Sequence, residues 1–262
     1  MKLIKQFFSS LLLICVFVLP NGVFAAQITQ LGFILDGSGS VSSSNYNLLR
    51  NGLKDAIAAL DVDGSVEITI TAYGSGTSTV VAPIILTAAT LPGIQSAILT
   101  HAKYGGGTDT AGAIRYTTNL MVGSAVFSDP NLRASIINLA TDGVPNSQSA
   151  AEAAAVYAFG AGIDALSIEA IGSGVNSGSA LTNMLKIAFP GPAQLLAVNE
   201  TNIPNPLGKS WVVPVSDFDA LAPVLKAKVI ASVKPPVTVP DPSSLMLFAL
   251  GLIGLGLARK RV

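Results

Sequence analysis

The stretch that decides the fold is Ile28-Thr-Gln-Leu-Gly-Phe-Ile-Leu-Asp-Gly-Ser-Gly-Ser40, in which an apolar run stops at Asp36 and small polar residues follow. A short apolar run with such an ending is typical of a buried strand. Alternate residues of an extended chain point the same way, so Asp36, Ser38 and Ser40 can turn their oxygens toward one point while the glycines let the backbone curve. One carboxylate and two hydroxyls form a hard-oxygen set, which suits Mg²⁺ or Mn²⁺ and not a soft metal.

Two later segments supply matching groups. Gly105-Gly106-Gly107-Thr108 is a glycine-rich loop, and Thr141-Asp142-Gly143 follows a second apolar run. Ligands of open α/β sheets bind beyond the carboxyl ends of the strands, which is where both aspartates lie. Each segment alone also fits an ordinary loop or turn, with Ser42 to Ser44 as helix caps. Together they predict a metal site made of Asp36, Ser38, Ser40, Thr108 and Asp142.

Strand-like and helix-like stretches alternate between these segments. Strands are predicted at Ile28–Leu35, Val66–Tyr73, Thr79–Leu86, Ala134–Ala140, Ala165–Ile171 and within Ser210–Val215. Helices are predicted at Asn45–Leu60, Leu91–His101, Thr110–Met121, Ala150–Ala161, Ala180–Ala188 and Phe218–Val229. The alternation indicates an α/β fold, Rossmann-like in outline, with a doubly wound, mostly parallel sheet and helices on both faces.

Both ends of the chain have the composition of addressing segments. Residues 1–25 combine Lys2 and Lys5, an apolar run and small residues at the end, the pattern of a signal peptide cleaved after Ala25. The run is shorter than the about 20 residues that a membrane span needs, which disfavours a permanent anchor. A domain at 26–232 and a proline-rich linker at 233–242 are expected next, followed by an apolar segment with a basic end at 243–262. The apolar run of this segment, Ser243 to Ala258, has 16 residues. As a helix it would be about 24 Å long, which is shorter than a hydrocarbon core of about 30 Å.

Charge and cysteine content exclude several classes of function. The only cysteine, Cys15, lies in the expected leader, so the mature domain is predicted to hold neither a disulfide nor a thiolate site. The chain has 15 basic and 15 acidic residues. Loss of both end segments would remove five of the basic ones and leave a mildly acidic domain. This charge balance disfavours nucleic acid as a partner.

The three polar segments resemble the metal-ion-dependent adhesion site (MIDAS) of the von Willebrand factor type A (vWA) domain family: Asp-x-Ser-x-Ser at Asp36, a threonine in a glycine-rich loop at Thr108, and Thr-Asp-Gly at Asp142. The resemblance covers roughly Gln30 to Ser232 and implies the strand order 3-2-1-4-5-6. It implies that Ser38 and Ser40 contact the metal directly, Thr108 directly or through water, and the two aspartates mainly through water. Mg²⁺ is the expected ion, with Mn²⁺ or Ca²⁺ as alternatives. An adhesion role is implied, in which the metal takes an acidic oxygen from a partner.

The C-terminus resembles the PEP-CTERM sorting signal of Gram-negative bacteria. Pro240-Asp241-Pro242 precedes the apolar run and Arg259-Lys260-Arg261, with Asp241 in place of the usual glutamate. The resemblance implies export across the inner membrane, transient membrane association of the precursor, processing by an exosortase-like enzyme, and a final place at the cell surface or in the extracellular matrix. A plain membrane anchor is the alternative, with the basic end on the cytoplasmic side.

The sequence is compatible with three kinds of function. The favoured one is a non-enzymatic adhesion or ligand-binding module. The second is an enzyme. With Ser38 as its nucleophile it would need a base, for which the chain offers one histidine, His101. Ser38 is also not in a Gly-x-Ser-x-Gly elbow. A metal-assisted hydrolase also lacks an evident base. The third is a structural matrix or biofilm protein whose metal is only stabilising.

Overall fold

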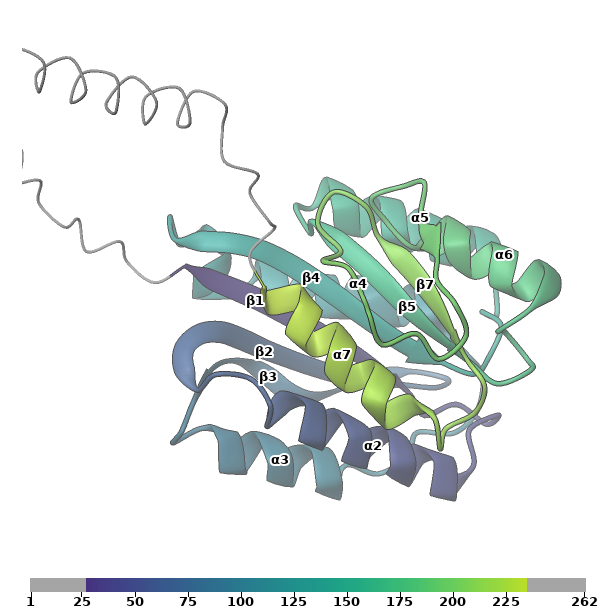
Figure 1. The fold of residues 1–262 in the computed structure, drawn as a ribbon, viewed down its shortest axis with the longest axis horizontal. Coiled ribbons are helices and arrows are strands. Elements are labelled where there is room, and N and C mark those ends of the chain that lie inside the picture. Colours follow the sequence, from purple (N-terminus) through teal and green to yellow (C-terminus); the bar gives the residue numbers. More distant parts are fainter. Residues whose placement is uncertain (1–26, 235–262) are drawn as a thin grey trace, which may run out of the picture.

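A seven-stranded sheet in the order β3-β2-β1-β4-β5-β7-β6 forms the centre of the molecule (Figure 1), in a computed structural model that describes residues 27–234. The strands are β1 Ile28–Asp36, β2 Asp63–Tyr73, β3 Thr77–Thr87, β4 Leu132–Thr141, β5 Ala165–Ile171, β6 Gln194–Leu195 and β7 Trp211–Val215. The helices are α2 Ser43–Ile57, α3 Leu91–Thr100, α4 Thr110–Val122, α5 Gln148–Gly160, α6 Gly178–Ile187 and α7 Leu221–Val233, with a 3-10 turn η1 at Ala125–Ser128. β3 alone runs antiparallel to its neighbour.

Helices cover both faces of the sheet, and each face has its own apolar core. α2, α3 and α7 lie over one face, where their side chains pack with those of β1 and β2 (Figure 1). α4, α5 and α6 lie over the other face, where α4 packs mainly against β1 and β2 and α6 packs against β5 and β7. Because the sheet is buried on both sides, all seven residues of β5 are buried, including the charged Glu169. The predicted doubly wound α/β fold is confirmed.

The order of the strands follows the one implied by the family resemblance, with β7 in the sixth place. β6 is an additional strand at the edge; it has two exposed residues and no apolar pattern that a sequence could reveal. α7 begins at Leu221 and not at Phe218, because Asp217 Oδ1 accepts a hydrogen bond from Ala220 N and holds a turn before the helix. The helix then continues to Val233, four residues past the predicted end.

Three of the predicted segments lie outside the described residues: the leader at 1–25, most of the linker at 233–242 and the sorting segment at 243–262. Within residues 27–234, no helix combines the length and apolar character needed to cross a membrane.

Candidate metal centre

The end of β1 and the end of β4 lie side by side and carry the two predicted aspartates. β1 and β4 are parallel neighbours with Leu35 opposite Ala140, so Asp36 emerges beside Thr141 and Asp142 follows directly. The strand order therefore joins segments about a hundred residues apart in the sequence, as the position of both aspartates at strand ends predicted.

Asp36 is fully buried and held by three hydrogen-bond donors. Its Oδ1 accepts from Ser38 N at 2.8 Å, while its Oδ2 accepts from the hydroxyls of Thr141 at 2.6 Å and Tyr73 at 3.1 Å. Burial is the main cause that raises the pKa of the Tyr73 hydroxyl well above its usual value, and the charge of the Asp36 carboxylate adds to it. Tyr73 therefore stays a donor. Asp36 is thus fixed in place by neutral donors, with no basic side chain hydrogen-bonded to it among the described residues.

A chain of short oxygen contacts joins the first segment to the third. Ser38 Oγ lies 3.0 Å from Ser40 Oγ, and Ser40 Oγ donates to Asp142 Oδ1 at 2.6 Å. Ser38 is fully buried, whereas Ser40 is exposed and Asp142 is half-buried, so the group opens to solvent on the side of Ser40. Burial, above all, raises the pKa of the Asp142 carboxyl above its usual value, as does the charge of Asp36, while the Ser40 hydroxyl and Lys103 oppose this.

Thr108 reaches the same group from the glycine-rich loop. A Cβ atom added at Gly143 would lie 3.0 Å from the Thr108 hydroxyl and 3.3 Å from the Ser40 hydroxyl. The two hydroxyls therefore lie close to the same point. Asn146 binds both backbone polar groups of Thr108. Its Oδ1 accepts from Thr108 N at 2.9 Å, and its backbone N donates to Thr108 O at 2.9 Å. The structure therefore brings all five predicted residues together.

The glycine-rich loop fits against the first segment because it has almost no side chains. Gly39 N donates to Gly106 O at 2.8 Å, and Gly105 N donates to Gly37 O at 2.6 Å. A Cβ at Gly74 would lie 2.1 Å from Gly105 O, closer than any real contact. Gly105 and Gly106 have φ values of +81° and +75°, which disfavour any other residue. Lys103 adds a further link by donating from Nζ to Ser38 O at 2.7 Å.

The chemistry of this group fits a hard divalent cation. It offers three hydroxyls and two carboxylates, and the two carboxylates repel one another unless a cation lies between them. Within residues 27–234, no three His, Cys, Asp or Glu side chains lie close enough together to hold a metal ion. A cation at this site would therefore depend on the three hydroxyls as well as on the two carboxylates. A cavity of about 270 Å³ opens beside Asp142, lined by Asn45, Ile171, Gly172, Ser173, Gly174, Asp217, Phe218 and Asp219.

Four residues of the site were missed by the sequence reasoning: Tyr73, Lys103, Thr141 and Asn146. Thr141 was within the quoted Thr-Asp-Gly segment but was not assigned a role. Tyr73 closes the predicted second strand, next in the sheet to β1, so its place beside Asp36 could have been inferred from the strand order. The sequence carries no comparable signal for Lys103 and Asn146, because loop geometry places them.

Comparisons with known proteins agree with this geometry. The family model for the von Willebrand factor type A domain matches residues 30–201, and the model for the PEP-CTERM protein-sorting motif matches residues 238–261. A comparison with curated protein sequences finds no match.

Solved structures share the fold at low identity. Proximal thread matrix protein 1 from the mussel byssus has a TM-score of 0.60 and 16% identity, over 78% of this chain and 48% of its own. The manganese-loaded TRAP protein of Plasmodium vivax has a TM-score of 0.52 and 19% identity, over 77% of this chain and 73% of its own. The pilus adhesin SpaC of Lactobacillus rhamnosus GG has a TM-score of 0.59 and 14% identity, over 78% of this chain and 30% of its own. This chain thus spans about half of the mussel protein and less of the adhesin.

Proposed function

Because the chain belongs to the von Willebrand factor type A domain family and carries a PEP-CTERM sorting motif, we propose that it is an exported surface or matrix protein that binds an acidic ligand through a divalent cation. The observation that carries this is the convergence of Asp36, Ser38, Ser40, Thr108 and Asp142 at one solvent-accessible edge of the sheet. Mg²⁺ is the proposed ion, since it prefers hard oxygen ligands and retains waters. One solved structure of the mussel matrix protein is described as having a zinc-occupied MIDAS motif, and the TRAP structure is described as manganese-loaded.

Each residue has a proposed task. Ser38 and Ser40 would contact the cation directly and Thr108 directly or through water. Asp36 and Asp142 would supply negative charge, mainly through water. When bound, the cation supplies positive charge and an open position for an oxygen of the ligand. The cavity beside Asp142 leaves room for the rest of the ligand to approach.

The geometry supports binding over catalysis. Both ring nitrogens of His101 lie 3.1 Å from hydroxyls other than Ser38, those of Tyr46 and Ser78. The Ser38 hydroxyl contacts Ser40, so the Ser–His pair that a serine hydrolase uses is not formed here.

The domain plan of the proposal has four parts: a leader at 1–25, the binding domain at 26–232, a linker at 233–242 and a sorting segment at 243–262. The export machinery would recognise the leader, and an exosortase-like enzyme would recognise the sorting segment. The short apolar run would hold the precursor in the inner membrane only transiently.

Capture of the protein on carboxylate-coated beads tests the proposal. We expect capture in millimolar Mg²⁺, loss of capture in EDTA, and loss in Asp142→Asn, which keeps an acceptor for Ser40 but removes a charge. Asp61→Asn, a matched change at an exposed residue outside the site, should be captured like the wild type. If the wild type binds Mg²⁺ in calorimetry but no carboxylate surface captures it, the metal is only stabilising and the protein is structural.

A further inference from the structure

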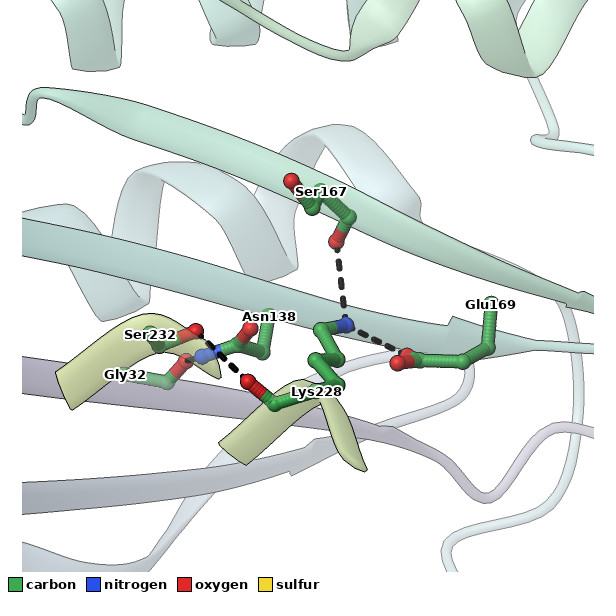
Figure 2. A network of polar contacts seen from close by, with 6 residues as sticks. All are labelled: Gly32, Asn138, Ser167, Glu169, Lys228 and Ser232. Carbon is green, nitrogen blue, oxygen red and sulfur yellow. Dashed lines mark hydrogen bonds and ion pairs between the residues drawn. The ribbon is translucent and has the colours of Figure 1, made fainter. Parts of the chain in front are cut away.

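A buried cluster of reactive groups lies between α7 and the sheet, away from the metal centre. The side chains of Lys228 in α7 and Glu169 in β5 are both fully buried, with Nζ 2.5 Å from Oε2 (Figure 2). Nζ also donates to the carbonyl of Ser167 at 3.2 Å and lies 5.2 Å from the centre of the Trp211 ring. The amine is therefore enclosed by an aromatic ring, a carboxyl group and one backbone carbonyl.

Asn138 of β4 shares this compartment. It pairs directly with Ser167 across the β4–β5 register, so its carboxamide stands beside the residue whose carbonyl holds Nζ. Alternate residues of a strand face the same side, which puts Ser167 and Glu169 on one face of β5, toward α7. Figure 2 shows the Asn138 carboxamide on this side of the sheet, by the turn of α7 from Lys228 to Ser232.

Three buried polar atoms of the cluster have no hydrogen-bond partner within residues 27–234: Asn138 Oδ1, Ser167 Oγ and Glu169 Oε1. The amide nitrogen of Asn138 reaches only Gly32 O, at the long distance of 3.5 Å. Buried polar groups of folded proteins are nearly always paired. Hydrogen bonding alone therefore does not account for three unpaired polar atoms in the compartment that holds Lys228.

Burial also favours the neutral forms of the pair. Desolvation raises the pKa of Glu169 above its usual value and lowers that of Lys228, although each charge partly offsets this for the other. A neutral lysine amine is a nucleophile, whereas its protonated form is not, and a protonated carboxyl group can act as a general acid.

We propose that Lys228 and Asn138 form an isopeptide bond within the folded chain, with Glu169 as the catalytic acid and base. Nζ of Lys228 attacks Cγ of Asn138, while Glu169 takes a proton from Nζ and delivers one to the departing nitrogen. The new C–N bond replaces the C–Nδ2 bond, and one ammonia molecule leaves. No oxidant, reductant or cofactor is consumed.

Such a bond would fasten α7 to the centre of the sheet. The single cysteine lies at position 15, so no disulfide can join parts of residues 27–234. An amide link is insensitive to the redox state of the surroundings, which suits a protein whose sorting motif directs it out of the cell.

Peptide mapping of the full chain by mass spectrometry tests the proposal. In the wild type, trypsin should fail to cleave after Lys228. The peptides that begin at Ala134 and Ala227 should appear as one branched species, lighter than their sum by one ammonia molecule. Recovery of separate, unmodified Asn138 and Lys228 peptides from folded wild-type protein would overturn the proposal and leave a buried ion pair.

Variants assign the roles within the cluster. Glu169→Gln keeps the shape and one acceptor oxygen for Nζ but removes the acid, and should abolish the branched species in protein that still folds. Lys226→Met, at an exposed lysine on the same helix, is the control and should leave cross-linking complete. A Glu169→Gln protein that cross-links as fully as the wild type would refute the catalytic role of Glu169. If that variant fails to fold, the wild-type peptide map still decides whether the bond exists.

Discussion

The hydroxyl of Tyr73 should contribute to folding stability even without a metal, because it helps to hold a buried carboxylate. Tyr73→Phe removes one of three donors to Asp36 and leaves the ring, so no cavity is created. A hydrogen bond to a charged group contributes about 1.5–3 kcal/mol. The contact with Thr141 at 3.2 Å is lost as well, but Thr141 still donates to Asp36. We therefore expect a loss of about 2 kcal/mol in the free energy of unfolding, or roughly 4–8 °C in Tm for a domain of this size.

Urea unfolding followed by circular dichroism, in excess EDTA, measures this loss. Tyr116→Phe is the matched control, because its hydroxyl contacts Thr79 at 2.9 Å on the exposed surface of the molecule. Its effect should stay within about 0.5 kcal/mol. Equal losses in the two variants, or no loss in Tyr73→Phe, would show that Asp36 is not held in advance of metal binding.

The remaining predictions concern the cation, the loop and the tail. Mg²⁺ at a hundredfold excess over its Kd should stabilise the protein by about 2.7 kcal/mol, seen as a higher Tm than in EDTA; an equal rise in Asp142→Asn would place the ion elsewhere. Gly74→Ala should displace the glycine-rich loop, since its Cβ would lie 2.1 Å from Gly105 O, and should weaken Mn²⁺ binding in calorimetry by at least about tenfold, or 1.4 kcal/mol. Gly93→Ala in α3, where a Cβ meets nothing within 4 Å, should leave binding unchanged. Protein recovered from the native cell envelope should lack the residues after about Pro242, and an intact mass that includes Val262 would make the tail a permanent anchor.

Much of the fold could be predicted from local patterns. β5 was predicted with its observed bounds because a strand buried on both faces forms an uninterrupted run, Ala165–Ile171, between turn residues. The start of α2 was predicted at Asn45, two residues late, because three serines precede it and any could be the cap; Ser42 takes this place by accepting from Asn45 N at 3.1 Å. β6 is held only by pairing with β7, which no local pattern records.

The residues of the metal centre also fall into those that local sequence predicts and those that only the fold reveals. The five proposed ligands were predicted because each lies in a short segment of unusual composition at the end of a strand or in a glycine-rich loop. Asn146 acts through hydrogen bonds to the backbone of Thr108, 38 residues away, and only the folded chain reveals this. Lys226 and Lys228 are equally polar in the sequence, yet the first is exposed and the second is buried, because a helix turns by about 200° over two residues.

The direction of α7 determines how the domain would carry a mechanical load. α7 starts beside the cavity next to Asp142 and ends at the opposite pole, where Arg133, at the start of β4, donates to Ser232 O. β1 begins and α7 ends at this same pole (Figure 1). A force between a ligand at the metal centre and a tether at Lys234 would therefore pull along the axis of α7. Sliding a helix lengthwise strains all its side-chain contacts together, whereas peeling it away breaks them one at a time, so this arrangement places α7 in its more resistant loading direction.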